Sequence, residues 1–545
     1  MPFLRPLPRS VTRPLAWVAL VAWVATMAVL VNRSYVRASS TNLATDLARY
    51  GPTAVWKGVY YRGEKIGFTV GQTTRTDDGF ELQEDGRLQM LLLGQDTVAK
   101  IRTTVHVDQT FVLRDFEFSL NPGTGPMTVR GTVTPPAGAG GPYRLILAIA
   151  SNGQTRTEMR ELPDAPVTSL NLSRLLARER LVPGTRHEWT VLDPATLHSA
   201  PVSVLVGERS MVVADGTKVP AFRVDLDFRG LQTTSWVTDT GEVVREESPL
   251  GLMTVRESAE RAQGLSMSGA VRADLLQAAA VVPVMDDRVD DTRDVRRLRL
   301  RLSGVELSPD HLDGVGQRVD GDAIEIVDPR ELRPGPVDPG AAAFLAPEPL
   351  IESDDPAIVA EARLAVGDAT DDRARAERLT RHVNGLLDKK PTVSLPSARE
   401  VLRTKVGDCN EHTALFVAMA RSAGIPARIA VGLVYMHGAF YYHAWPEVYL
   451  DEGGGRALWL PVDPTLNQFP ADATHVRLAR GGLDQQAAIL PLVGRLEMTV
   501  EEIELVPGTD RVLVGRERPA IDAAGFAFDL PQAASTGCRC SGREP

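Results

Sequence analysis

Residues 405–426, KVGDCNEHTALFVAMARSAGIP, decide the fold of the part of the chain in which we expect the chemistry to occur. A Gly-Asp turn precedes Cys409, an apolar stretch follows it, and Gly424 with a proline two residues later ends that stretch. Glycine just past the last helical turn, with proline beyond it, is typical of a helix end. The pattern predicts a central, buried helix that begins at Cys409 and ends near residue 423.

This placement puts Cys409 at a helix N-terminus. The unpaired backbone N–H groups and the positive end of the helix dipole favour thiolate over thiol. Because thiolate is the nucleophilic form of sulfur, we predict that the position activates Cys409. Its backbone N–H is a natural oxyanion donor, whereas the sequence identifies no second donor. The alternative is a structural cysteine, since free cysteine is often simply buried.

Three predicted strands follow the helix and carry two more polar side chains. By their alternation and turn residues they are residues 428–436 (RIAVGLVYM), 440–450 (FYYHAWPEVYL) and 457–463 (ALWLPVD). His443 lies on the second strand, and Asp463 ends the third. Neighbouring antiparallel strands are about 5 Å apart, so these two residues can be cross-strand neighbours. A helix packed on the sheet would then bring Cys409 against His443.

This set of side chains suits acyl transfer through a thiol. His443 would take the Cys409 proton and later return one to the leaving amine. Asp463 would accept the other imidazole N–H and stabilise the imidazolium. We therefore predict Cys409, His443 and Asp463 as the catalytic residues of an attack on an amide carbonyl through a thioester.

Several blocks of this region, in the same order, resemble the bacterial transglutaminase-like superfamily. They are GDCNEHT at 407–413, AGIPAR at 423–428, YYHAWPEVY at 441–449 and WLPVDPT at 459–465. The resemblance covers roughly residues 355–470 and implies a papain-like α+β core. It implies Cys409 as nucleophile, His443 as base and Asp463 as orienting acid. The superfamily includes cross-linking amidotransferases, amide-hydrolysing peptidases and inactive members, so it implies a chemistry rather than a substrate.

Other residues of these blocks have simpler interpretations. His412 lies three positions after Cys409 on the same helix, which ties it to the helix surface and favours a structural role. His437 is interpreted as a solvated turn residue, and Trp445 either walls the cleft or packs in the core. Cys409, His412 and His443 offer metal-ligand atoms, but the chain has no Cys-x-x-Cys or His-x-x-x-His pair. We therefore predict neither a metal nor another cofactor.

The whole chain is too long for a single core. Its 545 residues suggest two to four domains. A content of 43% hydrophobic and 24% charged residues indicates globular structure. A net charge of −10 without a long basic run argues against a nucleic-acid partner. The other cysteines, Cys538 and Cys540, are too few for a disulfide framework.

Residues 14–31, PLAWVALVAWVATMAVLV, form an uncharged apolar run close to the minimum length of a membrane-spanning helix. Three arginines precede the run and two follow it, which weakly favours a cytoplasmic N-terminus. The alternative is a cleaved signal peptide. Either interpretation exports the remaining chain. The expected location is the inner membrane, with a single span and the bulk of the protein in the periplasm.

The predicted fold is multidomain, with an N-terminal transmembrane helix, an antiparallel β-rich exported module and the α+β core. Alternation with turn signals over residues 50–265 indicates a half-barrel or a sandwich, with one helix near residues 170–180. The further parts are short strands and a proline-rich linker at 290–350, the transglutaminase-like domain at 355–475, C-terminal strands at 476–530 and a flexible tail at 531–545.

These features predict a membrane-anchored envelope enzyme that acts on a protein or peptide amide. Water as the acceptor would give hydrolysis, which we favour slightly, and a protein amine would give amide transfer. The β-rich module is expected to bind the substrate or an envelope protein. The alternative function is a catalytically silent envelope scaffold that retains the same fold.

Overall fold

The computed structural model describes most of the chain between residues 50 and 513. The described ranges are 50–51, 53–92, 95–121, 127–136, 138, 140–151, 154–194, 198–228, 231–248, 251–264, 279–285, 287–289, 291–305, 312–390, 397–481, 489, 492–507 and 512–513. The predicted membrane segment at residues 14–31 and the predicted tail with Cys538 and Cys540 lie outside these ranges. Within them, no helix has both the length and the apolar character needed to cross a bilayer.

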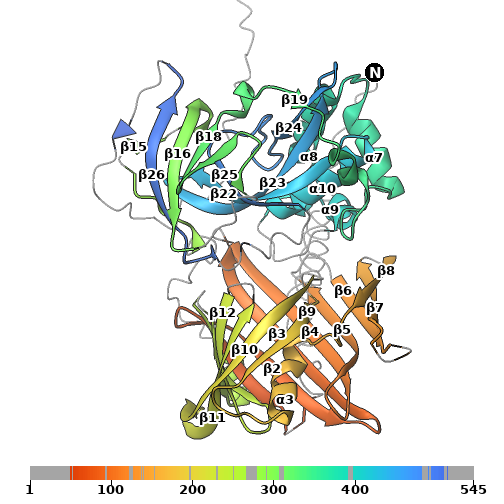
Figure 1. Ribbon diagram of the computed structural model, residues 1–545, viewed down its shortest axis with the longest axis vertical. Helices are drawn as coiled ribbons and strands as arrows, with labels where there is room; N and C mark the ends of the chain where they lie inside the picture. The colour runs from red at the N-terminus through yellow and green to blue at the C-terminus, as the bar shows by residue number, and fades with distance from the viewer. Residues whose placement is uncertain are drawn as a thin grey trace, which may run out of the picture.

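The N-terminal part of the described chain forms one antiparallel sheet of fourteen strands (Figure 1). In chain order they are β1 (Val55–Tyr61), β2 (Glu64–Arg75), β3 (Gly79–Leu92), β4 (Gln95–Asp108), β5 (Leu113–Asn121), β6 (Met127–Thr134), β7 (Tyr143–Ser151), β8 (Gln154–Leu162), β9 (Arg186–Asp193), β10 (His198–Ala214), β11 (Thr217–Phe228), β12 (Leu231–Val237), β13 (Val243–Glu247) and β14 (Leu252–Glu257). β1 pairs with β14, so two meanders, β1–β8 and β9–β14, join into a single sheet. This confirms the predicted antiparallel β-rich module.

Helix α3 (Ser169–Arg178) connects the two meanders and packs against both of them. The Asn171 side-chain amide donates to the carbonyl oxygen of Phe111 in the first meander, at 3.0 Å. Arg174 donates to the carbonyl oxygen of Thr240 in the second meander, at 2.6 Å. The apolar face of α3 enters the core between these contacts. The helix therefore holds the inner surface of the sheet together, at the position where the sequence predicts a helix.

The C-terminal part of the described chain combines helices with two further sheets. Its helices are α7 (Pro356–Val366), α8 (Asp372–Leu386), α9 (Ala398–Thr404) and α10 (Cys409–Ser422). The five-stranded sheet has the order β19 (Gly335–Pro336), β24 (Arg456–Pro461), β23 (Ala439–Asp451), β22 (Ala427–Met436) and β25 (His475–Gly481). The four-stranded sheet has the order β17 (Gln317–Asp320), β18 (Ala323–Val327), β16 (Val295–Ser303) and β26 (Glu497–Leu505).

Shorter elements complete the described chain. They are α4 (Ala259–Gln263), the pair β15 (Asp287–Arg288) and β27 (Val512–Leu513), the pair β20 (Asp388–Lys389) and β21 (Val406–Gly407), and the 3-10 turns η2 (Thr292–Asp294), η3 (Pro329–Glu331) and η4 (Ala341–Leu345).

One hydrophobic core joins the helices and both sheets of this C-terminal part. Figure 1 shows α7–α10 on one side of β22 and β23 and the four-stranded sheet on the other. β22 and β23 are therefore buried along almost their whole length, as their nearly continuous apolar sequence indicates. The predicted hairpin is confirmed, since His437 and Gly438 have the positive φ angles of a tight turn between these strands.

The strand pairs of this part connect segments that are far apart in the sequence. β16 pairs with β18 and also with β26, about two hundred residues away. The predicted domain boundary at residue 475 falls on the first residue of β25, which pairs with β22. The last strand of the five-stranded sheet therefore comes from beyond the predicted domain.

Two consecutive linker residues contribute to two different cores. Leu350 packs in the core of the β-rich module, whereas Ile351 packs in the core of the C-terminal part. A tight turn pairs Glu348 with Ile351, and Leu350 adopts a left-handed conformation with φ of 70°. The Leu350 carbonyl oxygen also accepts the backbone N–H of Ala398, the first residue of α9, at 2.8 Å. The linker is thus anchored on both sides.

Candidate active site

The turn before α10 places Cys409 at the first position of the helix. The Asp408 side chain caps the helix by accepting the backbone N–H of Asn410, at 2.9 Å. Glu411 reaches back to the Asp408 backbone N–H, also at 2.9 Å, which completes a capping box. A side chain at Gly407 would lie 2.2 Å from the Glu411 Cβ, so only glycine fits there. The predicted helix start is confirmed.

The first turns of α10 are fixed against β23 at Ala444, the residue that follows His443. The Thr413 hydroxyl, one turn after Cys409, donates to the Ala444 carbonyl oxygen at 3.0 Å. The Ala444 backbone N–H is near enough to the Cys409 sulfur to lower the pKa of the thiol. The start of α10 therefore lies beside Ala444, the residue that follows the predicted base His443.

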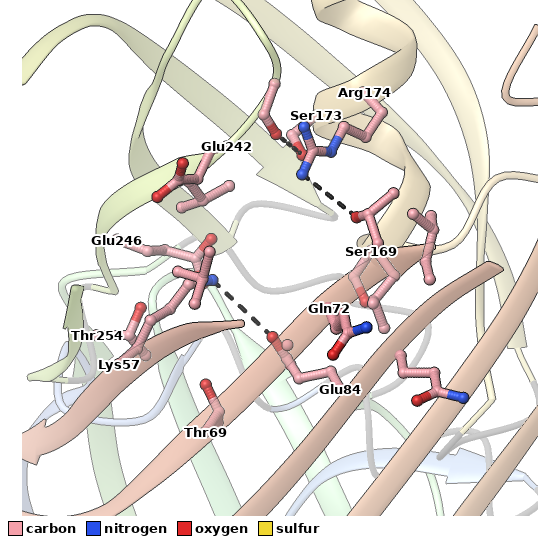
Figure 2. Close-up of a pocket in the computed structure, with 18 of the residues that line it drawn as sticks. Lys57, Thr69, Gln72, Glu84, Ser169, Ser173, Arg174, Glu242, Glu246 and Thr254 are labelled. Atoms are coloured by element: carbon pink, nitrogen blue, oxygen red, sulfur yellow. Dashed lines mark hydrogen bonds and ion pairs between the residues drawn. The ribbon is translucent and has the colours of Figure 1, made fainter. Parts of the chain in front are cut away.

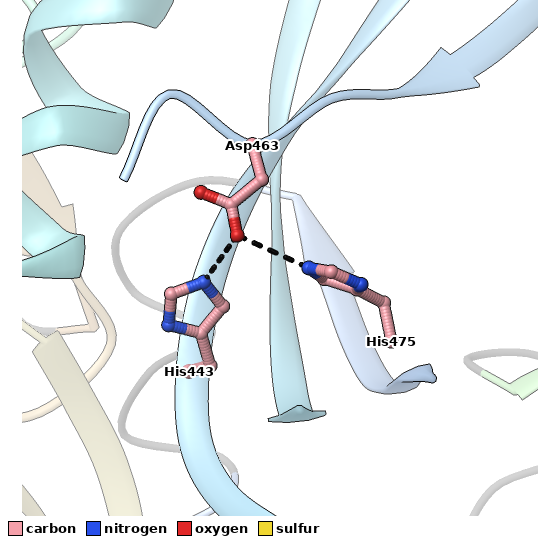
Figure 3. Close-up of side chains that lie close together, drawn as sticks. All are labelled: His443, Asp463 and His475. Carbon is pink, nitrogen blue, oxygen red and sulfur yellow. Dashed lines mark hydrogen bonds and ion pairs between the residues drawn. The ribbon is translucent and has the colours of Figure 1, made fainter. Parts of the chain in front are cut away.

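His443 and Asp463 are in direct contact, as predicted. The imidazole Nε2 donates to Asp463 Oδ2 at 2.7 Å, and both side chains are buried. Figure 3 shows that the second ring nitrogen, Nδ1, lies on the ring edge away from the carboxylate. Asp463 Oδ1 accepts the backbone N–H groups of Thr465 and Leu466, at 2.7 and 2.9 Å. The carboxylate is therefore held by four donors, because Oδ2 also accepts a second imidazole described below.

Asp463 contacts His443 from a turn, and not from a paired position on the neighbouring strand as predicted. The ladder between β23 and β24 ends at the pair Glu447 and Pro461, so Asp463 is not a laddered partner of His443. Asp463 instead lies in the turn after β24, where its backbone pairs with Gln468. This turn places the Asp463 carboxylate beside the His443 imidazole.

The surroundings of Cys409 favour the thiol, whereas the helix start was predicted to favour the thiolate. Burial raises the pKa of the Cys409 thiol well above its ordinary value, and Asp408, Glu411 and Asp463 act in the same direction. The Ala444 backbone N–H opposes them. Because lost hydration and nearby negative charges oppose the thiolate, we expect ionisation of this sulfur to require a base.

A second histidine, His475, lies at the site and is not among the residues predicted from the sequence. Its Nε2 donates to Asp463 Oδ2 at 3.1 Å, and its Nδ1 lies 3.1 Å from Asp472 Oδ1. Figure 3 shows the His443 and His475 rings meeting at the same carboxylate oxygen. Burial opposes the ionisation of Asp463, but the two imidazoles hold the pKa of this carboxyl well below its ordinary value. The sequence contains one signal that could have pointed to this histidine, the spacing Asp-x-x-His at residues 472–475, where a buried strand begins.

The other histidines and the tryptophan of the blocks occupy the simpler roles. His412 is buried, and its Nδ1 donates to the Asp408 carbonyl oxygen one turn earlier, at 2.7 Å. Burial lowers the pKa of His412, which keeps this ring neutral. The fully buried Trp445 ring contacts the His475 ring edge-on, with centroids 5.1 Å apart, and therefore belongs to the core behind the site. His437 lies in the hairpin turn.

Three of these groups also have the spacing of a metal site. One ligand atom each from His443, Asp463 and His475 lies within 4.8 Å of the others. In this arrangement both imidazoles donate an N–H to the same carboxylate oxygen. A metal ion would have to replace these two hydrogen bonds, so the geometry fits a hydrogen-bonded cluster better than a coordination site.

A concave site lies in the β-rich module, between α3 and strands of both meanders (Figure 2). The cavity has a volume of about 370 Å³ and is lined mainly by hydroxyl, amide and charged groups. Lys57 lies 3.9 Å from Glu84 across it, and Arg174 reaches in from α3. The described lining residues include neither cysteine nor histidine. This cavity is therefore suited to binding a polar group rather than to nucleophilic catalysis.

Comparisons with known proteins address the C-terminal part most directly. The family model of the transglutaminase-like superfamily matches residues 361–464. No curated protein matches the chain. A solved candidate cysteine protease from Cytophaga hutchinsonii is 17% identical, with 42% of this chain and 89% of that chain covered and a TM-score of 0.27.

Two further solved structures are similar to parts of the chain. A β-barrel-like protein of a domain of unknown function from Brucella abortus is 12% identical, with 37% and 94% of the two chains covered and a TM-score of 0.30. A candidate protease from Parabacteroides distasonis is 11% identical, with 62% and 65% covered and a TM-score of 0.17. The family match spans α10, the hairpin of β22 and β23, and the turn after β24. This chain therefore contains a domain of the transglutaminase-like superfamily at residues 361–464.

Proposed function

We propose that this chain is a thiol acyl-transfer enzyme that attacks an amide carbonyl and forms a thioester on Cys409. The observation that carries the proposal is the arrangement at His443 and Ala444 on β23. Ala444 holds the helix that begins at Cys409, and His443 is bonded to the buried Asp463 carboxylate. Family membership of the domain gives this order of residues the same interpretation.

The first half of the reaction breaks the amide bond. Nδ1 of His443 takes the Cys409 proton, and the thiolate adds to the carbonyl carbon. The resulting oxyanion accepts the Cys409 backbone N–H at the helix start. When the intermediate collapses, the C–N bond breaks, His443 gives its proton to the departing amine, and the acyl group stays on sulfur as a thioester. Asp463 keeps the imidazole oriented throughout and stabilises its cationic form.

The second half of the reaction releases the acyl group. Water adds to the thioester carbonyl carbon and loses a proton to His443. The C–S bond then breaks, which releases a carboxylic acid, and His443 returns the proton to the sulfur to restore the thiol. An amine in place of water would give a new amide. We propose hydrolysis as the principal outcome because the Cys409 residue is only half-buried, although its sulfur is shielded enough for burial to raise the pKa of the thiol.

One observation favours the rival function, a non-catalytic scaffold. The raised pKa of the Cys409 thiol is what a structural cysteine would show. The two functions differ in whether His443 controls the reactivity of the sulfur, because a scaffold has no use for this coupling.

Alkylation by iodoacetamide, followed by peptide mass spectrometry of the purified full chain, separates the two functions. An enzyme predicts that Cys409 at pH 7 reacts faster than in the urea-denatured chain. His443→Ala should slow the alkylation by about 10²-fold or more, which is the usual contribution of a positioned base. His437→Ala, in the hairpin turn, is the matched control and should leave the rate unchanged. A rate that is indifferent to His443 would support the scaffold.

Location and partners belong to the same proposal. We propose that residues 14–31 anchor the chain in the inner membrane, with the described domains in the periplasm, and that the substrate is a protein or peptide amide. The polar cavity beside α3 is the proposed site at which the β-rich module holds part of the substrate or of an envelope partner. Protease accessibility in spheroplasts tests the location. Trapping of an acyl group on Cys409 from envelope extracts, absent in Cys409→Ala, would identify the substrate.

A further inference from the structure

The second histidine of the site, His475, has both ring nitrogens against oxygen atoms that only accept hydrogen bonds. Nε2 lies 3.1 Å from Asp463 Oδ2. Nδ1 lies 3.1 Å from Asp472 Oδ1 and 3.2 Å from the Asp472 carbonyl oxygen. A neutral imidazole carries one N–H and one lone pair, so one of these contacts would oppose a lone pair to a carboxylate. Both contacts are satisfied only when His475 is an imidazolium.

Asp472 is held as an anion by its own surroundings. Its carboxylate accepts the hydroxyl of Thr292 and the side-chain amide of Gln468, at 2.6 and 2.7 Å. It also accepts the backbone N–H and the hydroxyl of Thr474, at 2.9 and 2.6 Å. Burial opposes its ionisation, but His475 and these donors keep the pKa of Asp472 below its ordinary value.

The electrostatics of His475 agree with this geometry. Burial would lower its pKa, but Asp472 and Asp463 together raise the pKa of His475 to about 9. The groups that face its ring are Asp463 from the turn after β24, Asp472 from the segment before β25, and the rings of His443 and Trp445 from β23. The ring centroids of His443 and His475 are 5.9 Å apart. At neutral pH a cation therefore lies behind the Asp463 carboxylate, which contacts the predicted base.

We propose that His475 is a positioning residue, a buried imidazolium that fixes Asp463 and takes up part of the negative charge that would otherwise favour the cationic form of His443. The inference deepens the proposed function and rests on it for the role of His443. A base that retained its proton too strongly would form the thiolate readily but would protonate the departing amine poorly. His475 sets the balance between these two proton transfers.

The expected size of the effect follows from the distance. Two unit charges 5.9 Å apart, at an effective dielectric constant of about 20, change a proton-transfer equilibrium by about 100-fold. Removing the positive charge of His475 should therefore favour transfer of the Cys409 proton to His443. Without the His475 cation, the Asp463 charge also opposes the thiolate. Its effect on His443 is larger, because Asp463 is bonded to His443 at 2.7 Å and does not contact the sulfur directly. The net prediction is thiolate formation at lower pH.

The test is the pH dependence of Cys409 alkylation in the full chain, measured from pH 5 to pH 9. His475→Gln keeps a donor toward Asp463 without the charge, and the midpoint of its profile should move to lower pH by up to about two pH units. His382→Gln is the matched control, because it removes a second histidine bonded to a carboxylate, Glu361, in the same domain. The control profile should coincide with that of the native chain.

The outcomes distinguish the two proposals. Slow, His443-independent alkylation of the native chain would refute the proposed function. Fast alkylation of the native chain, with a folded His475→Gln variant whose profile is unchanged or moved to higher pH, would refute the role of His475 alone. Circular dichroism establishes that the variant is folded.

A second measurement does not depend on the His475 variant. In the full chain labelled with ¹⁵N-histidine, one imidazole should keep both nitrogens protonated at pH 8, where an ordinary histidine is neutral. The signal should persist in His106→Gln, since His106 is another histidine whose pKa is raised by neighbouring carboxylates. It should lose one proton in Asp472→Asn. A spectrum without a protonated imidazole at pH 8 would refute the inference.

Discussion

Replacing Glu447 by glutamine would test whether a buried ion cluster holds together the sheet that carries the site. Glu447 on β23 is completely buried and lies between two arginines from different strands. Arg428 on β22 donates to it at 2.7 Å, and Arg477 on β25 donates to it at 3.0 Å. Glutamine has nearly the same shape but no charge, so the substitution would leave two guanidinium groups buried without their shared anion.

The cost follows from this loss of pairing. Burial opposes the ionisation of Glu447, but Arg477 and Arg428 hold its pKa below the ordinary value, so the native carboxylate is charged at pH 7. Removing one partner of a buried ion pair costs about 3–5 kcal/mol of unfolding free energy. The amide oxygen still accepts one hydrogen bond, so we expect about 3 kcal/mol. For a folding unit of the size of the C-terminal part, a loss of about 3 kcal/mol in unfolding free energy lowers Tm by about 6–12 °C.

The assay is thermal unfolding of the full chain at pH 7, followed by circular dichroism. Glu501→Gln is the matched control, because Glu501 on β26 also lies between two arginines, Arg299 and Arg301, at 3.2 and 2.7 Å. That cluster is exposed to solvent, so its loss should change Tm far less. Equal changes in the two variants, or a Glu447→Gln variant as stable as the native chain, would refute the reasoning.

Two more predictions concern the elements around the site. The folded protein binds the His475 proton more tightly than the unfolded chain does, because the pKa of His475 in the folded protein is about 9. This proton therefore stabilises the fold fully below about pH 6.5, and the stabilisation is lost as the pH rises through about 9. Urea unfolding should show a loss of about 3 kcal/mol over this interval, and a flat profile would contradict the prediction. Gly432→Ala would place a Cβ 2.0 Å from the Val476 carbonyl oxygen on β25, so we expect a loss of about 1–3 kcal/mol in urea unfolding. Gly385→Ala in α8, where the added Cβ has open space, should be neutral or slightly stabilising, and equal results for the two alanine variants would argue against close packing at β25.

The parts of the site that the sequence predicted depend on local patterns. The helix at Cys409 could be predicted because Asp408 caps its start and Gly424 ends it. The hairpin that carries His443 could be predicted because its strands are adjacent in the sequence and joined by a tight turn. His475 depends instead on the strand order β23–β22–β25, which brings a later strand to the far side of β22. Short-range patterns contain no information on that order.

The pKa of the Cys409 thiol could not be predicted from the local sequence. The sequence predicts where the helix starts, but the helix dipole is only one of several influences on the thiol pKa. Burial and nearby carboxylates, among them Asp463 from a distant turn, act in the opposite direction. Their balance follows from the packed structure and not from the position of the residue in its helix.

The anchoring of Leu350 and Ile351 in separate cores has a structural consequence. The peptide unit that joins these two residues connects the two cores directly. The Leu350 carbonyl oxygen also holds the first residue of α9, the helix that leads into the turn before Cys409. The core of the large sheet is therefore linked to the backbone before Cys409 through one hydrogen bond and the short helix α9.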